Sequence, residues 1–283
     1  MRIWGGLGNQ MFQYASGHAL AHRLGVSLLL HPTASRPAHA RFALEIFERP
    51  LKLWEPEQKA SGLFAPLSRP PKGKKAVKAW RGPIFEQAQF CLTDGFWDIT
   101  PGSYVTGYFQ SERFFMDQAQ SIKEFFDIKR FTEGISEEFL TAANAPGAVS
   151  VHIRRGDYAT DANIRSIHGL LGNDHYDRAM KLMQRIENIN AWLVFSDDPY
   201  DAAELTKDWP HRIIVSGNSA IQDMALMSAC SHHIIANSSF SWWGAWLGQN
   251  PDKAVIAPRR WFADAEMRQT YVDGVYPEGW ILV

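Results

Sequence analysis

The chain has 283 residues, 46% of them hydrophobic, so it can bury the core of one large domain or of two domains of ordinary size. Its formal net charge of -1 excludes a general attraction to nucleic acid or to an anionic membrane surface, so any anionic ligand must be held locally. The start MRIWGGLGNQ has no signal-peptide pattern, and no run approaches the roughly 18 to 20 apolar residues of a membrane span. We expect a cytoplasmic protein without a transmembrane segment.

The cysteines and acidic residues indicate neither a disulfide nor a metal site. Cys91 and Cys230 lie in unrelated contexts without a CxxC partner, which is typical of buried thiols in a reducing compartment. The chain has no DxD pattern and no His/Cys/carboxylate set with the spacing of catalytic zinc. We therefore expect no metal.

The first half of the chain predicts an α/β pattern. A very short strand at 2–4 leads through the loop GGLGNQ into a helix at 9–25, whose apolar stripe is followed by Gly25, a typical residue after a helix. A strand at 26–30 follows, and later a strand at 103–109 leads into a helix at 111–126. Pro146 and Gly147 mark the best linker, at 142–148. We expect an N-terminal, acceptor-side lobe over 1–143 and a C-terminal, nucleotide-sugar-binding lobe over 147–283.

The second half alternates short β-branched runs with helical patterns. The predicted strands are 148–153, 191–195, 212–216, 233–236 and 254–258, and helices are predicted over 174–189, 199–209, 219–230 and 239–251. This alternation favours a parallel, doubly wound sheet. Polar, charged and glycine residues follow each strand, and ligands of such sheets bind beyond the carboxyl ends of the strands.

The segment HIRRGDY, at 152–158, holds the strongest site signal. A guanidinium can grip two phosphate oxygens at once, and two arginines in one turn are more than a turn requires. Adjacent side chains on an extended backbone point to opposite faces, so we expect Arg154 to bind phosphate and Arg155 either to reach around or to pair with Asp157. The alternative is that both arginines are structural ion-pair partners. His152 lies two residues before Arg154 and shares its face.

Three other segments carry weaker signals. Gly6 and Gly8 belong to a strand-to-helix turn whose backbone amides suit an anion, and Ser238 and Ser239 begin a second such turn. For Asp197 and Asp198, a contact of one of them with a nucleobase or ribose and a helix N-cap are equally good interpretations. The basic stretch at 69–82 suits an anionic acceptor or a lipid headgroup, which leaves a peripheral membrane contact open, but a solvated loop is the simpler explanation.

Several of these motifs together carry a family resemblance. GGLGNQMFQYA at 5–15, GYFQSE at 107–112, HIRRGDY at 152–158, FSDD at 195–198 and DMALMSACSHHIIANSSFSWWGAWL at 223–247 occur in order over nearly the whole chain. They resemble the bacterial α-1,2-fucosyltransferases of glycosyltransferase family 11. The resemblance implies a GT-B type fold of two Rossmann-like lobes with parallel sheets and a cleft between them. It also implies GDP-β-L-fucose as donor, inversion at the fucose anomeric carbon, no required metal, and an oligosaccharide acceptor, typically ending in galactose.

The resemblance also implies roles for individual residues. It places the donor pyrophosphate on Arg154, with Asn9 near the diphosphate and the phosphates held at Ser238, Ser239 and Phe240. It implies that Asp197 or Asp198, together with Asp223, contacts the guanosine. The first strand, MRIW, is shorter than is usual in the family.

The expected mechanism is electrostatic stabilisation of the departing GDP by Arg154 and by helix N-termini. Asp157 and His152 are candidates by position for the base that takes the acceptor proton. Two alternatives stay open: a transferase of the same fold that uses another nucleotide sugar, and a nucleotide-sugar-binding protein without catalytic activity.

Overall fold

The computed structural model describes residues 1–33, 41–54, 80–87, 95–186, 188–265, 267 and 274–283. The chain divides into two compact units, the first formed by Met1–Phe125 with Asp273–Val275 and the second by Phe126–Val272 with Tyr276–Val283. The predicted basic stretch lies outside the described residues over 69–79, as does Cys91. Within the part of the chain that is described, no helix has both the length and the apolar character needed to cross a bilayer.

The first unit is built around one long helix, α1 (Leu7–Leu24). In its described residues, β1 (Arg2–Ile3) pairs in parallel with β2 (His31–Pro32), and β3 (Ile84–Glu86) pairs in parallel with β4 (Tyr104–Thr106). The remaining elements are α3 (Ala119–Phe125) and short 3₁₀ turns at Leu44–Phe47, Phe96–Asp98, Glu112–Phe114 and Met116–Gln118.

Three predictions for this unit need correction. The strand expected at 26–30 is found later, as β2, and Leu30 makes only an isolated bridge to Leu53. The strand expected at 103–109 is confined to β4, and the helix expected at 111–126 is divided into two 3₁₀ turns and α3. Helix α1 ends as predicted, because Gly25 adopts the left-handed conformation with φ 65° and donates its N–H to the last helical carbonyls.

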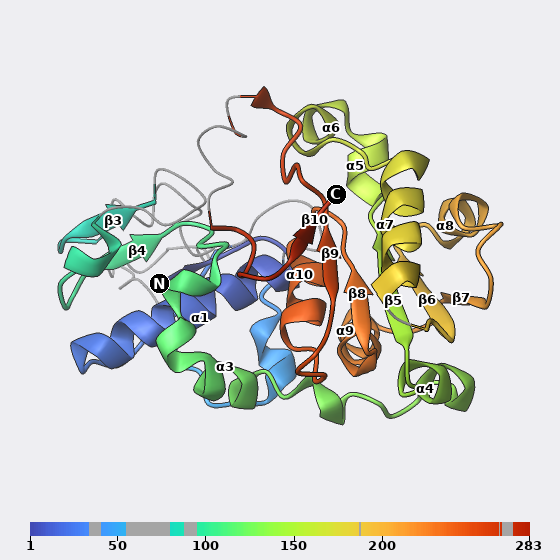
Figure 1. Cartoon of the computed structure of the whole chain (residues 1–283). Helices are drawn as coiled ribbons and strands as arrows, with labels where there is room; N and C mark the ends of the chain where they lie inside the picture. The colour runs from blue at the N-terminus through green and yellow to red at the C-terminus, as the bar shows by residue number, and fades with distance from the viewer. Residues whose placement is uncertain (34–40, 55–79, 88–94, 187, 266, 268–273) are drawn as a thin grey trace, which may run out of the picture. The chain divides into compact units, whose positions relative to one another are not determined.

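The second unit contains a six-stranded, fully parallel sheet (Figure 1). Its strands are β5 (Ala148–Ile153), β6 (Ala191–Ser196), β7 (Arg212–Val215), β8 (His232–Ile234), β9 (Val255–Ala257) and β10 (Ile281–Leu282). The spatial order is β10-β9-β8-β5-β6-β7, which is the order of the doubly wound dinucleotide-binding fold. The predicted parallel sheet is therefore confirmed. β10 was not predicted, because two residues are too few for a periodicity signal.

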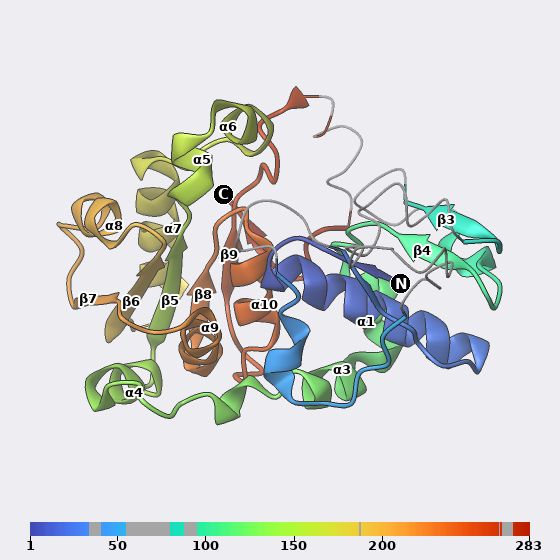
Figure 2. The same ribbon diagram turned by 180° about the vertical axis from the view of Figure 1, so that it is seen from behind.

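Helices cover both faces of this sheet. α7 (Asn173–Ile186) and α9 (Ala220–Ala229) lie on opposite faces, as Figures 1 and 2 show from the two sides. The connections are completed by α8 (Pro199–Leu205) and α10 (Ser239–Trp246). α5 (Gly156–Thr160) and α6 (Ala162–His168), which were not predicted, follow the end of β5. Before β5 the unit holds a 3₁₀ turn at Ile128–Arg130 and α4 (Glu137–Ala143).

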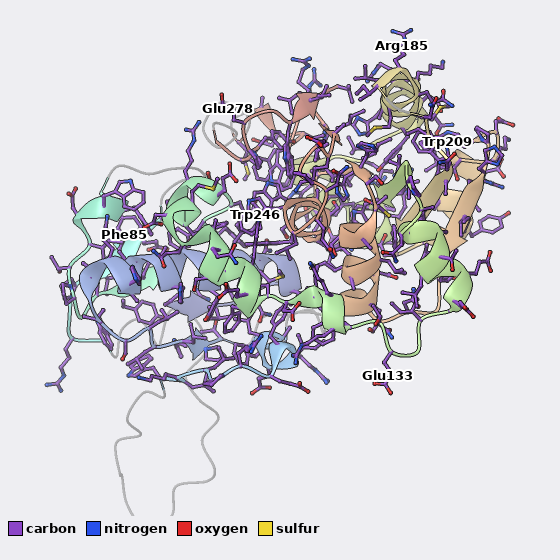
Figure 3. The ribbon with its side chains drawn as sticks, turned by 60° about the horizontal axis from the view of Figure 1, so that its bottom comes forward. Phe85, Glu133, Arg185, Trp209, Trp246 and Glu278 are labelled. Atoms are coloured by element: carbon purple, nitrogen blue, oxygen red, sulfur yellow. The ribbon has the colours of Figure 1, made fainter. Side chains whose placement is uncertain are left out.

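The alternation of side chains along β5 creates two cores. Val149, Val151 and Ile153 pack with residues of α7 and α8 in one cluster, whereas Ala148 packs with residues of α4 and α9 in the other. Burying each valine or isoleucine contributes roughly 1.5 to 3 kcal/mol. Because the two clusters lie on opposite faces of the sheet, side chains pack against β5 from both sides. Arg185 near the end of α7 is exposed and points away from the unit (Figure 3).

The boundary between the compact units does not coincide with the predicted linker. The second unit begins at Phe126, so α4 belongs to it, packs against β5 and β6 and ends inside the predicted linker at 142–148. The division into functional lobes over 1–143 and 147–283 stays a prediction.

Candidate functional site

The sheet order places the candidate site of the second unit at the ends of β5 and β8. These neighbouring strands pair through Val151 and Ile234, and their connections run to opposite sides, which makes this the topological switch point. The turns that follow them also touch, because the Tyr158 hydroxyl donates to the Asn237 carbonyl oxygen at 3.2 Å. The structure thus brings together two of the three turns predicted to hold phosphate, HIRRGDY and NSSF.

Arg154 is the central cation of this region. Its Nη2 lies 2.6 Å from Asp157 Oδ1 and its Nη1 lies 2.7 Å from Asp197 Oδ2, while its guanidinium carbon lies 5.4 Å from the centre of the Tyr158 ring. The side chain is 27% exposed, so solvent and solutes can reach the guanidinium. Two carboxylates and an aromatic face therefore fix an accessible cation at the switch point.

Arg155 is buried and serves the scaffold. Its Nε pairs with Asp201, and its Nη1 donates to the Leu171 carbonyl oxygen at 2.8 Å. The predicted pairing of Arg155 with Asp157 is wrong, because Asp157 binds Arg154 instead. Sequence reasoning missed Asp201, which lies three residues after Asp198 in the first turn of α8; the third aspartate close behind a predicted strand was the available signal.

Gly156 and Asp197 close the turn after β5. Asp197 Oδ1 accepts the backbone N–H of Arg155 at 2.7 Å while its Oδ2 holds the Arg154 guanidinium. A Cβ on Gly156 would lie 2.2 Å from Asp197 Oδ2, and the glycine φ is +26°. Only glycine leaves room for this carboxylate, which explains the glycine of the motif. Asp198 is the N-cap of α8, since its Oδ1 accepts the Asp201 N–H at 3.0 Å, in agreement with the N-cap interpretation.

His152 is the next-to-last residue of β5 and lies next to α10. It is buried, its ring centre lies 5.7 Å from that of Phe240, and its Nδ1 has no hydrogen-bond partner in the structure. Burial and the neighbouring Arg154 charge lower the pKa of His152 to about 3. The imidazole is therefore neutral at neutral pH and weakly basic, and it keeps an unused hydrogen-bonding nitrogen.

The N-terminus of α10 forms the other side of the switch point. Ser238 is its N-cap, with Oγ accepting the Phe240 N–H at 3.3 Å, and Ser239 is the partly exposed first residue of the helix. Asn237 ties this turn to its surroundings, because its Nδ2 donates to the carbonyl oxygens of His168 and Trp261 at 2.8 and 3.3 Å. A helix N-terminus of this kind provides positive potential for an anion.

Asp223 lies in the first turn of α9 and carries an unusual carboxyl group. Burial raises its pKa to about 6, while the hydrogen bond from Asn218 Nδ2 at 3.1 Å opposes the rise. The predicted cap of this helix is confirmed, since Ser219 forms a capping box with Gln222. A half-buried carboxylate near a helix start can accept hydrogen bonds from an uncharged ligand.

The glycine loop belongs to the first unit. Gly6 is the N-cap of α1 without a side-chain cap, and Gly8 is buried in the first turn. Asn9 Oδ1 accepts a hydrogen bond from Gln110 Nε2 at 2.8 Å, so the motif GGLGNQMFQYA is joined to the motif GYFQSE. Sequence reasoning missed this pair. It also missed that Gln13 is buried, where it binds the Trp4 N–H and the Gly107 carbonyl oxygen.

Across the described residues, no group of three or more histidine, cysteine, aspartate or glutamate side chains is arranged to hold a metal ion. Metal independence stays a prediction. Cys230 is buried and unpaired, and burial raises the pKa of its thiol.

Comparison with known proteins places these motifs in one family. The model of glycosyl transferase family 11 matches residues 1–283. The α-1,2-colitosyltransferase of Escherichia coli is 32% identical over 100% of this chain and 97% of its own length. The O-antigen biosynthesis glycosyltransferase WbnK of Escherichia coli is 31% identical over 92% of this chain and 93% of its own. The structure of NodZ α-1,6-fucosyltransferase soaked with GDP-fucose aligns with 90% of this chain and 93% of its own at 14% identity and a TM-score of 0.49.

Proposed function

Because this chain belongs to glycosyl transferase family 11, we propose that it transfers L-fucose from GDP-β-L-fucose to the 2-hydroxyl of a sugar acceptor, with inversion at the fucose anomeric carbon. The acceptor of this proposal is an oligosaccharide, with galactose as its terminal sugar. The observation that supports it most directly is the accessible Arg154 guanidinium, held at the switch point of a doubly wound sheet beside the N-terminus of α10.

In this proposal the donor diphosphate binds between Arg154 and the first turn of α10. The diphosphate of a nucleotide sugar carries two negative charges, as many as the two carboxylates that hold the guanidinium, and its oxygens suit the planar fork, so it can share Arg154 with Asp157 and Asp197 or replace one of them. Ser238 and Ser239 add hydroxyl groups next to the helix amides. As the glycosidic bond breaks, charge grows on the leaving phosphate, and a fixed cation stabilises that charge without reorganising.

The guanine base is proposed to bind on the α9 and α10 side of β5. The neutral ring of His152 has an unused Nδ1, and the Asp223 carboxylate accepts hydrogen bonds above its raised pKa of about 6. Guanine carries both donors and acceptors on its edge and can use both groups. With a pKa of about 3, His152 suits this role better than that of a general base. Asp157 stays the candidate base, and its Oδ1 lies 2.6 Å from Arg154 Nη2.

No metal enters this mechanism, because Arg154 and the α10 N-terminus supply the positive charge that a divalent ion would otherwise bring. Asn9, with Gly6 and Gly8 in its turn, is proposed to contact the donor diphosphate. Its carboxamide is oriented in advance by Gln110.

A second candidate donor is GDP-colitose. A relative 32% identical over this whole chain is an α-1,2-colitosyltransferase, and colitose lacks only the 3-hydroxyl of fucose. Both sugars leave the same GDP group, so the phosphate chemistry at Arg154 does not distinguish them. A site that hydrogen-bonds the 3-hydroxyl would reject colitose strongly, whereas an apolar site would discriminate only weakly.

The proposal is tested by incubating the protein with GDP-fucose or GDP-colitose and a panel of lactose-type acceptors, with and without EDTA. We expect an α-1,2 linkage by NMR and rates unchanged by EDTA, and the ratio of kcat/KM values identifies the donor. A thermal-shift comparison of GDP, UDP and GDP-mannose provides the control for binding. Stabilisation by UDP but not by GDP, or loss of turnover in EDTA, contradicts the proposal.

A further inference from the structure

A cavity of about 540 Å³ lies in the second unit. Its walls are the loop His168–Gly172, the first turns of α7 and the residues Arg260 and Ala263 beyond β9. The volume falls within the usual range of small-molecule sites. None of the residues that we place around the GDP group lines it.

Two guanidinium groups on this cavity are unengaged. Among the described residues, neither Arg178 on α7 nor Arg260 has a hydrogen-bond or ion-pair partner. Neighbouring arginines differ: Arg259 donates to the Leu282 carbonyl oxygen at 3.0 Å and Arg165 to that of Tyr158 at 3.1 Å. One carboxylate, that of exposed Asp174, also lines the cavity, so the wall keeps an excess of positive charge.

His175 contributes a polar atom that the protein does not satisfy. The residue lines the cavity, is 5% exposed, and its Nε2 has no hydrogen-bond partner. The backbone of Ile235 hydrogen-bonds the ring, and burial together with the Arg178 charge lowers the pKa of His175 to about 4. The ring is therefore neutral at neutral pH. With the other nitrogen bound to the backbone, Nε2 is an acceptor suited to a ligand hydroxyl.

We propose that this cavity binds a phosphate ester that carries hydroxyl groups, such as a sugar phosphate, with Arg178 and Arg260 on the phosphate and His175 on a hydroxyl. Two unengaged guanidiniums favour phosphate because each can grip two oxygens. The first turn of α7 lines the cavity and adds positive potential. The same phosphate chemistry is carried by free sugar phosphates and by phospholipid headgroups.

The cavity is connected to the donor turn through ring stacking. Tyr158, beneath the Arg154 guanidinium, stacks on His168 with ring centres 4.8 Å apart, and His168 lines the cavity. Leu171, another lining residue, accepts from Arg155. Tyr158 contacts both Arg154 and His168, and the lining includes none of the residues proposed to hold GDP, so we expect a ligand there not to compete with GDP.

Galactose 1-phosphate, inorganic phosphate and vesicles of phosphatidylglycerol with phosphatidylcholine are the probes. We expect isothermal titration at physiological salt to show saturable binding of galactose 1-phosphate, weakened at least tenfold in the Arg178→Gln/Arg260→Gln variant. Arg185→Gln removes the same charge from the exposed end of the same helix and should leave binding unchanged. His175→Phe should reduce the preference for galactose 1-phosphate over inorganic phosphate. GDP affinity, measured in parallel, should be unchanged in all variants.

The vesicle arm identifies the source of the phosphate. Cosedimentation with anionic vesicles that is lost in Arg178→Gln/Arg260→Gln but kept in Arg185→Gln assigns a lipid headgroup, whereas binding of the free ester alone assigns a soluble ligand. Either result supports the proposal. Absence of saturable binding to every probe, equal losses in Arg185→Gln, or displacement of galactose 1-phosphate by GDP overturns it.

Discussion

Replacement of Arg154 tests whether its guanidinium stabilises the negative charge that grows on the leaving phosphate. In the Arg154→Ala variant a growing phosphate charge loses its fixed guanidinium, and such a contact is worth on the order of 10² to 10³ in rate. The variant also leaves Asp157 and Asp197 without their common partner. A carboxylate about 4 Å from a phosphate repels it by about 1 to 4 kcal/mol, depending on the local dielectric. We therefore expect kcat/KM to fall by about 10³ or more.

Removal of a stranded carboxylate that has no proposed part in proton transfer should restore part of this loss. The double variant Arg154→Ala/Asp197→Asn lacks one of the two uncompensated charges and keeps the candidate base Asp157, so we expect roughly tenfold higher kcat/KM than for Arg154→Ala alone. Arg154→Lys keeps the charge without the planar fork and should fall between wild type and Arg154→Ala. Steady-state kinetics with GDP-fucose and a galactoside measures all three variants.

Thermal unfolding separates chemistry from scaffolding in the same variants. The two ion pairs of Arg154 are partly exposed, and such pairs contribute at most about 1 kcal/mol each, so we expect Arg154→Ala to lower Tm by no more than a few degrees. A variant that unfolds would show that Arg154 is a structural residue. Full transfer by a folded Arg154→Ala protein would remove the proposed phosphate contact.

Three further predictions concern neighbouring residues. Gly156→Ala places a Cβ 2.2 Å from Asp197 Oδ2 at a φ of +26°, so we expect unfolding free energy to fall by about 1 to 3 kcal/mol and transfer to drop with it; an unchanged denaturation midpoint contradicts the tight turn. Asp198→Ala removes only an N-cap and should cost about 1 kcal/mol without changing the Kd of GDP; a weakened Kd would instead support a nucleoside contact. Asp223, whose pKa is raised from 3.8 to about 6, takes up a proton more readily in the folded than in the unfolded protein, so its contribution to stability declines as pH rises from about 4 to about 6 and is constant above. Asp223→Asn should abolish that decline in Tm, and GDP affinity of the wild type should weaken below about pH 6; titrations at pH 5 and pH 7.5 that agree would refute this role.

The sequence predicted the second unit better than the first. Strand β5 was predicted to the residue, because its β-branched residues recur at every second position in a short segment, a pattern that favours a strand over a helix. In the first unit, β1 and β2 have two residues each, and strands so short are set by long-range pairing and leave no local pattern. The segment expected to be a helix at 111–126 begins with a 3₁₀ turn that Ser111 caps. The hydrogen bond of the Ser111 side chain to the backbone competes with α-helical hydrogen bonding, and the apolar pattern does not reveal this.

The residue types of the candidate site could be recognised from the sequence alone, because adjacent arginines, a glycine and paired serines at strand ends have a chemistry of their own. Their partners could not. Strand β5 lies beside β6, which brings residues more than forty positions apart into contact. This pairing decides which of the two arginines is accessible, and it brings Asp197 and Asp201 to them. The spatial order of the sheet likewise decides that the turns after β5 and β8 meet. Local patterns determine which segments become strands and helices, but hydrogen bonding between distant strands determines which side chains become neighbours.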